Sequence, residues 1–191
     1  MKTFIVISII IFLGNQVAVA RGVYQQPAEF LSDVFQKEVP EVNYFWLTGD
    51  KKNAVKNILG HAYSKLRLKY WIKKDRIVWI LDEIGKEEPI TLGIVVKRDH
   101  IEQLKVLIYR ESRGEEVRHT FFTSQFKGIT LDKNKRLSQS IDGITGATLS
   151  VRALKRLSRL ALWLSEAVLS KRPAESSVPT LPLSVKIQGA F

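Results

Sequence analysis

Alternation between apolar and polar side chains along residues 66–110 constrains the fold more than any other feature of this sequence. A repeat of two residues is the period of a β-strand with one buried face. The expected strands and connections are 66–72, a turn at 73–76, 77–81, 90–97, a polar connection at 98–103, and 104–110. Consecutive strands with such short connections form antiparallel hairpins, so the sequence predicts a meander of about four strands.

Apolar residues spaced three and four apart predict helices on both sides of this meander. A short helix is expected at 27–36. A second is expected at 50–59, where Asp50 is a candidate N-cap and Gly60 a C-terminal stop. The longest helix is expected from about 150 to 169. This order predicts a single α+β domain, in which an antiparallel meander packs with helices and the last helix closes the fold.

The N-terminus has the features of an export signal at 1–20. Lys2 gives a positively charged start before the apolar run at 4–13. Ala18 and Ala20, two small residues separated by one position, form a signal-peptidase cleavage site. The alternative is an uncleaved membrane anchor, but polar residues at 15–16 interrupt the run well short of the roughly 20 residues that a spanning helix needs. Cleavage is therefore favoured, with Arg21 as the new N-terminus and the periplasm or another extracytoplasmic space as the location.

The chain contains no cysteine. In an exported protein this excludes disulfides, thiolate metal sites, iron–sulfur clusters and thioether-linked haem. The histidines, His61, His100 and His119, show no metal-ligand spacing, so no metal site is predicted. No side chain is assigned a catalytic role. A redox function would therefore need an organic cofactor.

The formal net charge of the whole chain is +11. In an exported protein this favours anionic membrane surfaces or acidic protein partners over nucleic acid, which is not expected as a ligand. A solvated basic surface is the alternative explanation. Four basic residues, Arg152, Lys155, Arg156 and Arg159, occupy much of one face of the last helix, where solvation and docking of a partner are the two alternatives. If this face docks a redox partner, charge reversal at Arg156 and Arg159 is expected to slow electron exchange in a salt-dependent way and to leave the thermal midpoint nearly unchanged.

The segment 142–150 joins an irregular polar stretch to the last helix. Gly143 and Gly146 permit backbone conformations and close approaches that a side chain would block. A helix N-terminus that follows offers free N–H groups and a partial positive charge, which together suit a phosphate. Thr148 brings a hydroxyl to that point. The alternative is that Thr148 or Ser150 merely caps the helix and the glycines form a turn.

The spacing Asp-x-x-Thr-Gly-Ala-Thr in this segment resembles the attachment motif of the FMN-binding domain family. That family includes domains of the sodium-translocating NADH:quinone oxidoreductase and of the Rnf complex. The resemblance implies that a flavin transferase, using FAD and Mg²⁺, attaches FMN through a phosphoester to the last threonine. By position, the site residues are Thr148 for attachment, with Asp142, Gly143, Thr145, Gly146 and Ala147 around it. Arg152 is expected to help neutralise the phosphodiester.

Further residues agree with the family pattern across about 84–165. They are Pro89 and Ile90, Gly93, Glu111, Gly114, and Phe122 and Phe126 before Gly128. In the family, the loop that holds Glu111 and Gly114 commonly lies near the isoalloxazine ring. This chain departs from the family there, because it reads Glu-Ser-Arg-Gly in place of the frequent Glu-Thr-Pro-Gly.

Together with the resemblance, these patterns divide the chain into four parts: the signal at 1–20, an N-terminal helical and hairpin extension at 21–83, the FMN-binding domain at 84–170 and, from its Pro, Ser and Thr content, a mobile tail at 171–191. It implies an exported flavoprotein that carries electrons between the membrane and an extracytoplasmic redox partner. An exported flavin-dependent reductase of a small molecule and a non-redox binding or structural module are the alternatives.

Overall fold

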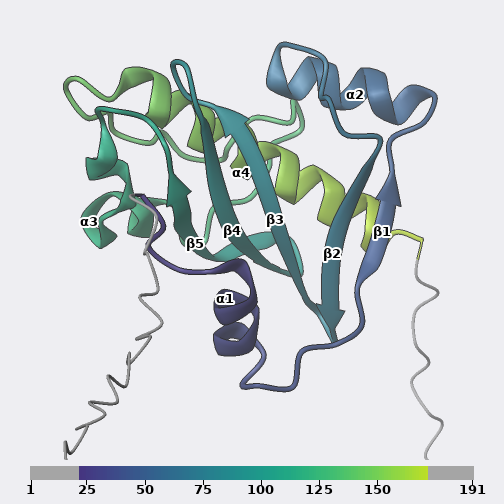
Figure 1. Cartoon of the computed structure of the whole chain (residues 1–191). Coiled ribbons are helices and arrows are strands. Elements are labelled where there is room, and N and C mark those ends of the chain that lie inside the picture. Colours follow the sequence, from purple (N-terminus) through teal and green to yellow (C-terminus); the bar gives the residue numbers. More distant parts are fainter. Residues whose placement is uncertain (1–21, 172–191) are drawn as a thin grey trace, which may run out of the picture.

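A computed structural model describes residues 22–171 (Figure 1). The predicted export signal at 1–20 lies outside the described residues, as does all but the first residue of the predicted tail at 171–191. Among the described residues, no helix combines the length and the apolar character that crossing a membrane requires.

A five-stranded sheet forms the centre of the molecule, and every neighbouring pair of strands is antiparallel. The strands are β1 (Asn43–Trp46), β2 (Arg67–Lys73), β3 (Arg76–Ile84), β4 (Pro89–Lys97) and β5 (His100–Tyr109), in that spatial order. The predicted meander is confirmed. The first strand was not predicted, because four residues are too few for a period to be recognised.

The predicted polar connection at 98–103 is wrong. Only two residues, Arg98 and Asp99, separate β4 from β5, and Arg98 has the positive φ of 57° that such a tight turn needs. His100, Glu102 and Gln103 are polar because they lie on the partly exposed side of this end of β5, whereas Ile101 between them is buried. Glu102, for example, forms an ion pair with Arg76 on β3 across the sheet, with Oε2 at 2.6 Å from Nε.

Three helices occur close to where their spacing predicted them. They are α1 (Pro27–Val34), α2 (Asp50–Leu59) and α4 (Thr148–Leu169). The short α3 (Thr120–Thr123) and the 3₁₀ turns beside it, η1 (Glu115–Arg118) and η2 (Ser124–Phe126), were not predicted. Gly60 ends α2 with a φ of 81°, as expected. Asp50 is not the N-cap of α2, because Gly49 occupies that position and Asp50 is the first helical residue.

Two helices cover opposite faces of the sheet (Figure 1). The long α4 packs across one face, where a buried hydrogen bond of 2.8 Å from Trp79 Nε1 to Ser165 Oγ ties it to β3. The short α1 packs on the other face, with Phe30 directly over Gly93. A Cβ at Gly93 would lie 2.4 Å from the Phe30 ring, so glycine is required for this contact. The predicted α+β single domain is confirmed.

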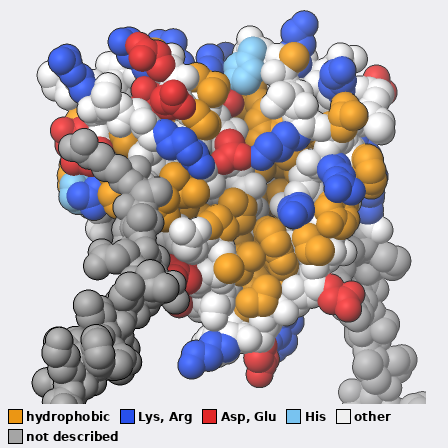
Figure 2. Space-filling model, viewed as in Figure 1, with side chains coloured by type: hydrophobic (Ala, Val, Ile, Leu, Met, Phe, Trp, Pro, Cys, Tyr) orange, Lys and Arg blue, Asp and Glu red, His pale blue; other side chains and the backbone are white. Residues whose placement is uncertain are grey.

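The face that carries α1 is covered only in part. Figure 2 shows apolar side chains gathered on this face, with lysine and arginine side chains around them. The opposite face is closed by α4 and α2, whose apolar residues form one large cluster with the sheet. The fold therefore leaves one area of the sheet open for contacts with other molecules.

Candidate functional site

A tight turn sets the start of α4. The Ala147 N–H donates to the carbonyl oxygen of Ile144 at 3.0 Å, and Gly146, third of the four turn residues, has a φ of 83°. A positive φ at this position is the mark of a type II turn, which favours glycine. Gly143 differs, because its φ is not positive and a Cβ there would meet no atom within 4 Å. Nothing in the structure requires glycine at position 143.

Thr148 is the first residue of α4, and its side chain is exposed. The N-cap position belongs to Ala147, and no side chain caps the helix. Ser150 is buried, and its Oγ lies 2.8 Å from the hydroxyl of Tyr109. The alternative that Thr148 or Ser150 caps this helix is therefore wrong. Within residues 22–171 the Thr148 hydroxyl has no hydrogen bond, which leaves it free to react.

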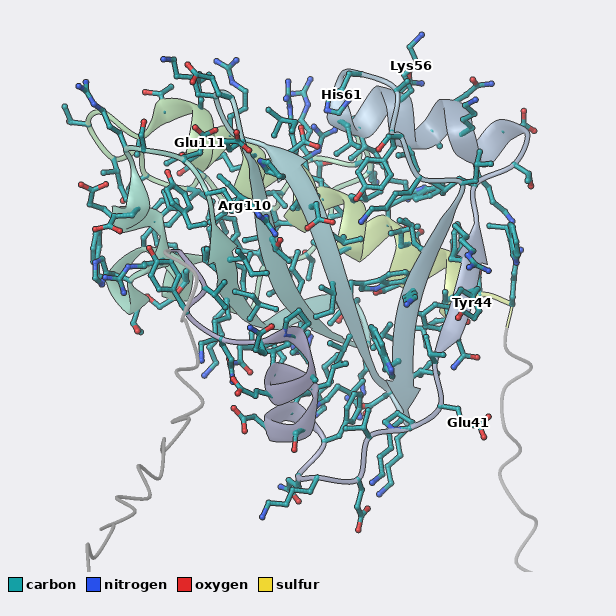
Figure 3. The ribbon with its side chains drawn as sticks, in the orientation of Figure 1. Glu41, Tyr44, Lys56, His61, Arg110 and Glu111 are labelled. Atoms are coloured by element: carbon teal, nitrogen blue, oxygen red, sulfur yellow. The ribbon has the colours of Figure 1, made fainter. Side chains whose placement is uncertain are left out.

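Thr148 lines a cavity of about 520 Å³, formed where three separate segments meet. They are the β3–β4 loop, the loop that follows β5, and the first turn of α4. The lining residues are Lys86, Glu87, Glu111, Ser112, Arg113, Gly146, Ala147, Thr148, Leu149 and Ser150. This size lies within the range of pockets for small ligands and cofactors. Figure 3 shows Glu111 at the end of the sheet where β3 turns into β4.

The cavity brings together only some of the predicted site residues. Glu111, Gly146, Ala147 and Thr148 line it. Asp142, Gly143 and Thr145 are exposed and do not line it. The N–H of Asp142 donates to Gln125 Oε1 at 2.8 Å, which fixes the backbone ahead of the turn and leaves the carboxylate at the surface.

Glu111 organises the loop opposite Thr148. Its Oε1 accepts hydrogen bonds from the backbone N–H groups of Lys86, Glu87 and Glu88, the last two at 2.8 and 3.1 Å. Gly85 precedes them, and a Cβ there would lie 2.6 Å from the same oxygen. One carboxylate thus holds consecutive donors of the β3–β4 loop, and hydrogen bonds to a charged acceptor are stronger than neutral ones.

Glu111→Ala is expected to lower the free energy of unfolding by about 1.5–3 kcal/mol, the usual contribution of hydrogen bonds to a charged group. The amides of residues 86–88 would exchange hydrogen faster, because their common acceptor is gone. Urea denaturation and amide hydrogen exchange measure the two effects. Unchanged exchange at 86–88 would show that Glu111 does not hold this loop.

Gly114 allows the loop after β5 to approach the start of α4. Its φ is 86°, and a Cβ there would lie 2.9 Å from the Tyr109 hydroxyl and 3.1 Å from the Ala147 Cβ. The Tyr109 hydroxyl donates to the Arg113 carbonyl oxygen at 2.5 Å and contacts Ser150, as described above. Burial raises the pKa of Tyr109, so its hydroxyl remains protonated at neutral pH and available for these bonds. Any larger residue at position 114 would push α4 away from β5.

Two basic side chains in the cavity were missed from the sequence. Lys86 pairs with Glu87, Nζ to Oε1 at 2.8 Å. Arg113 makes no side-chain hydrogen bond or ion pair with any residue in the described part of the chain. An unpaired guanidinium suits a phosphate oxygen. The departure of this chain from the family pattern at residues 111–114 was the available signal. Arg152, expected to neutralise the phosphodiester, instead lines a neighbouring cavity.

The other cations on α4 are committed to contacts within the fold. Lys155 Nζ donates to the Ile141 carbonyl oxygen at 2.7 Å, and Arg159 Nε donates to the Lys135 carbonyl oxygen at 2.8 Å. Partial burial lowers the pKa of Arg159. Of the four basic residues predicted to form a solvated or docking face, only Arg152 is fully exposed and without a side-chain partner in the described structure. Treating all four as free surface charges was wrong.

Arg156 faces a buried carboxylate. Its NH1 lies 3.3 Å from Oε1 of Glu83, whose side chain is only 1% exposed. The same oxygen lies 2.7 Å from Nε2 of His61, at the connection between α2 and β2. Glu83 Oε2 is buried and has no partner. The hydrogen bond to Glu83 raises the pKa of His61, so protonation of His61 and folding favour each other.

This cluster predicts a pH dependence of stability. A raised pKa in the folded state means that the contribution of protonated His61 is complete below its unfolded value of 6.5 and is lost as the pH rises through the folded value. Wild type should therefore lose stability relative to His61→Gln between about pH 5.5 and about pH 8.5. Urea denaturation at both pH values measures this difference, which should stay constant if His61 does not titrate against Glu83.

Comparison with known families agrees with this geometry. Residues 85–162 match the family model described as FMN-binding domain. The match begins in the β3–β4 loop, includes the loop at 111–114 and ends within α4, so it contains every wall of the cavity. The resemblance predicted from the attachment motif is confirmed for this part of the chain. No curated protein matches the chain.

Proposed function

We propose that this protein is an exported flavoprotein that carries FMN through a phosphoester on Thr148 and transfers electrons. One observation carries the proposal: within an FMN-binding domain, Thr148 presents an exposed hydroxyl without a hydrogen-bond partner in residues 22–171, on the wall of a cavity of about 520 Å³. Ala147 holds the N-cap position, so the Thr148 hydroxyl is not used to cap the helix. The free hydroxyl supports a chemical role.

The residues around Thr148 fit a phosphate. The N–H groups of Thr148, Leu149 and Ser150 lie in the first turn of α4, where a helix supplies no backbone acceptor. These donors and the positive end of the helix dipole favour an anion there. Arg113, across the cavity, would supply a second contact to the same group. Thr148, the first turn and Arg113 would thus hold the phosphate, while the exposed Leu149 offers apolar surface beside it.

Attachment uses the Thr148 oxygen as the nucleophile. With FAD as the donor, Thr148 Oγ1 forms a bond to the FMN phosphorus, the phosphoanhydride bond breaks, AMP leaves and the hydroxyl proton is released. A flavin transferase is the partner that this step requires. The exposed position of Thr148 and Asp142, outside any internal hydrogen-bonding network of side chains, leaves both accessible to that enzyme.

Bound FMN would supply one- and two-electron redox chemistry, and the protein would supply its position and surroundings. A covalent tether prevents loss of the cofactor outside the cytoplasm. The proposed exchange partners are a membrane donor and a membrane or exported acceptor. Neither the reductase nor the non-redox module, named above as alternatives, is favoured by any contact at the site.

Intact-mass analysis of the protein recovered from its native envelope tests the proposal. The expected mass is that of the chain from Arg21 onward plus one FMN minus one water. A mass that retains residues 1–20 would contradict cleavage of the signal, whereas a mass without the flavin increment would contradict the flavoprotein assignment.

Electron transfer is tested separately with the loaded protein and energised envelope membranes. Flavin absorbance at its oxidised maximum is expected to fall on mixing and to recover when an acceptor is added. A flavin that does not respond to membranes but turns over with a soluble donor and a small acceptor would indicate a reductase instead.

A further inference from the structure

One area of the sheet, on the face that carries α1, has no covering element in the described structure. The helix α1 covers part of this face. Its residues Phe30 and Leu31, with Phe35 just after its last residue, pack on Val78, Val95 and Leu107. Beside them the face continues over β1, β2 and β3 without a helix (Figure 1). We call this area the open face and define it by Tyr44, Trp46, Arg67, Lys69, Trp71 and Ile80.

Strand register places these side chains on one side of the sheet. Tyr44 and Trp46 flank Phe45, which is buried in the core on the α4 side, so both point the other way. Tyr44 pairs with Lys69, and Trp46 pairs with Arg67. On β2, Trp71 continues the same alternation and packs against the α1 cluster.

Aromatic rings and cations lie side by side on the open face. Tyr44 is 40% exposed and Trp46 is 51% exposed, which is unusual for rings of this size. The Arg67 guanidinium lies 4.8 Å from the centre of the Tyr44 ring and 5.9 Å from that of Trp46. This stacking holds one cation and two aromatic rings in a fixed platform at the surface.

The charge of the open face and its rim is positive. Lys69 is exposed and has no ion pair with any residue between 22 and 171, and Arg67 has only its aromatic contacts. At the rim, Asp82 is neutralised by Lys65, with Oδ2 at 2.5 Å from Nζ. A shallow hollow of about 390 Å³ lies among these side chains and Pro27.

We infer that the open face docks on the surface of a bilayer that contains anionic phospholipid. Tryptophan and tyrosine favour the boundary where an apolar layer meets a polar one, because each has an apolar body and a polar tip. Lysine and arginine at the same level contact lipid phosphates, and each contributes to attraction toward an anionic leaflet. The net charge of +11 adds long-range attraction toward the same surface.

A bilayer fits this face better than an acidic protein does. At the membrane surface, lipid phosphates and acyl carbons lie within one thin layer. The aromatic rings and cations of the open face project from the same side of the sheet, so both kinds of group can reach that layer together. An acidic protein would satisfy Arg67 and Lys69 but would need its own apolar surface for Trp46 and Tyr44. The inference is independent of the flavin on Thr148, so failure of either leaves the other intact.

Vesicle co-sedimentation tests the inference. The form that begins at Arg21 is used because it retains every described element and lacks the apolar run at 4–13, which would itself favour lipid. It is expected to sediment with vesicles of phosphatidylcholine and phosphatidylglycerol, weakly with phosphatidylcholine alone, and less as salt is added.

The variants are designed to separate this face from general basicity. Trp46→Ala and Lys69→Glu should each weaken the partition coefficient about tenfold, through lost apolar contact and reversed charge respectively. Lys133→Glu is the matched control, because Lys133 is exposed on the α4 side and should leave binding within about twofold. Thermal denaturation checks that all three variants remain folded.

Three results would overturn the inference. The first is no sedimentation with anionic vesicles, as an acidic protein partner would give. The second is equal loss for Lys133→Glu and Lys69→Glu, which would show that net charge alone acts. The third is a dimer in solution that Trp46→Ala dissociates, which would make the open face a contact between two copies of this chain.

Discussion

Thr148→Val protein is expected to carry no covalent flavin after co-expression with a flavin transferase, while wild type fluoresces on a denaturing gel. Valine keeps the shape of the threonine side chain but replaces the hydroxyl group, its only nucleophile, with a methyl group. Because the Thr148 hydroxyl makes no capping bond, the substitution should change the free energy of unfolding by only about 0.5 kcal/mol. Loss of flavin with unchanged stability would show that the Thr148 hydroxyl is needed for attachment and not for folding.

Thr145→Val is the internal control, since it removes a neighbouring hydroxyl from the same turn. Thr145 does not line the cavity, so loading should persist, reduced only as far as the transferase recognises this residue. Asp142→Ala should also load less, because a surface carboxylate in the motif is lost. Flavin that survives denaturation in Thr148→Val protein would refute the assignment of the attachment residue.

Arg156→Glu is expected to lower the free energy of unfolding by about 3 kcal/mol, because it leaves a buried carboxylate without its guanidinium partner. Glu83 is nearly inaccessible to water, and the new carboxylate would face it from α4. His61 would remain its only hydrogen-bond partner. Urea denaturation at neutral pH measures the loss.

Arg152→Glu is the matched control, one turn earlier on the same helix. Arg152 is exposed and has no side-chain partner among residues 22–171, so its reversal should stay within about 0.5 kcal/mol of wild type. Equal effects of the two reversals would show that the contact with Glu83 contributes nothing to folding. The sequence-based expectation of an unchanged thermal midpoint is thereby replaced for Arg156 by one of marked destabilisation.

Much of the fold was predictable because its signals are local. The alternation of apolar and polar side chains along 66–81 predicts a pair of strands directly, because the polarity of each residue indicates whether it faces the core. The strand at Asn43–Trp46 was missed because its pairing with β2 is a contact between distant segments. Residues 100–103 were misassigned because a partly exposed strand end and a polar loop have the same composition.

The candidate site was likewise predictable only where its residues are neighbours in the sequence. The helix start follows from neighbouring residues and was predicted to within two residues, whereas the glycine turn was named only as part of the alternative interpretation. Lys86 and Arg113 were not predicted, because the folded sheet brings their loops to α4 from more than thirty residues away along the chain. The cations of α4 were judged by helix periodicity alone, which carries no information about carbonyl groups and a buried Glu83 on other elements.

Peptide mass mapping of the wild-type protein, isolated with its flavin, tests the central claim most directly. Fragmentation of the peptide that spans residues 142–152 should place the whole increment of FMN minus water on Thr148, with Thr145 and Ser150 unmodified. An increment on Thr145, on Ser150 or on a peptide outside this segment would contradict the account.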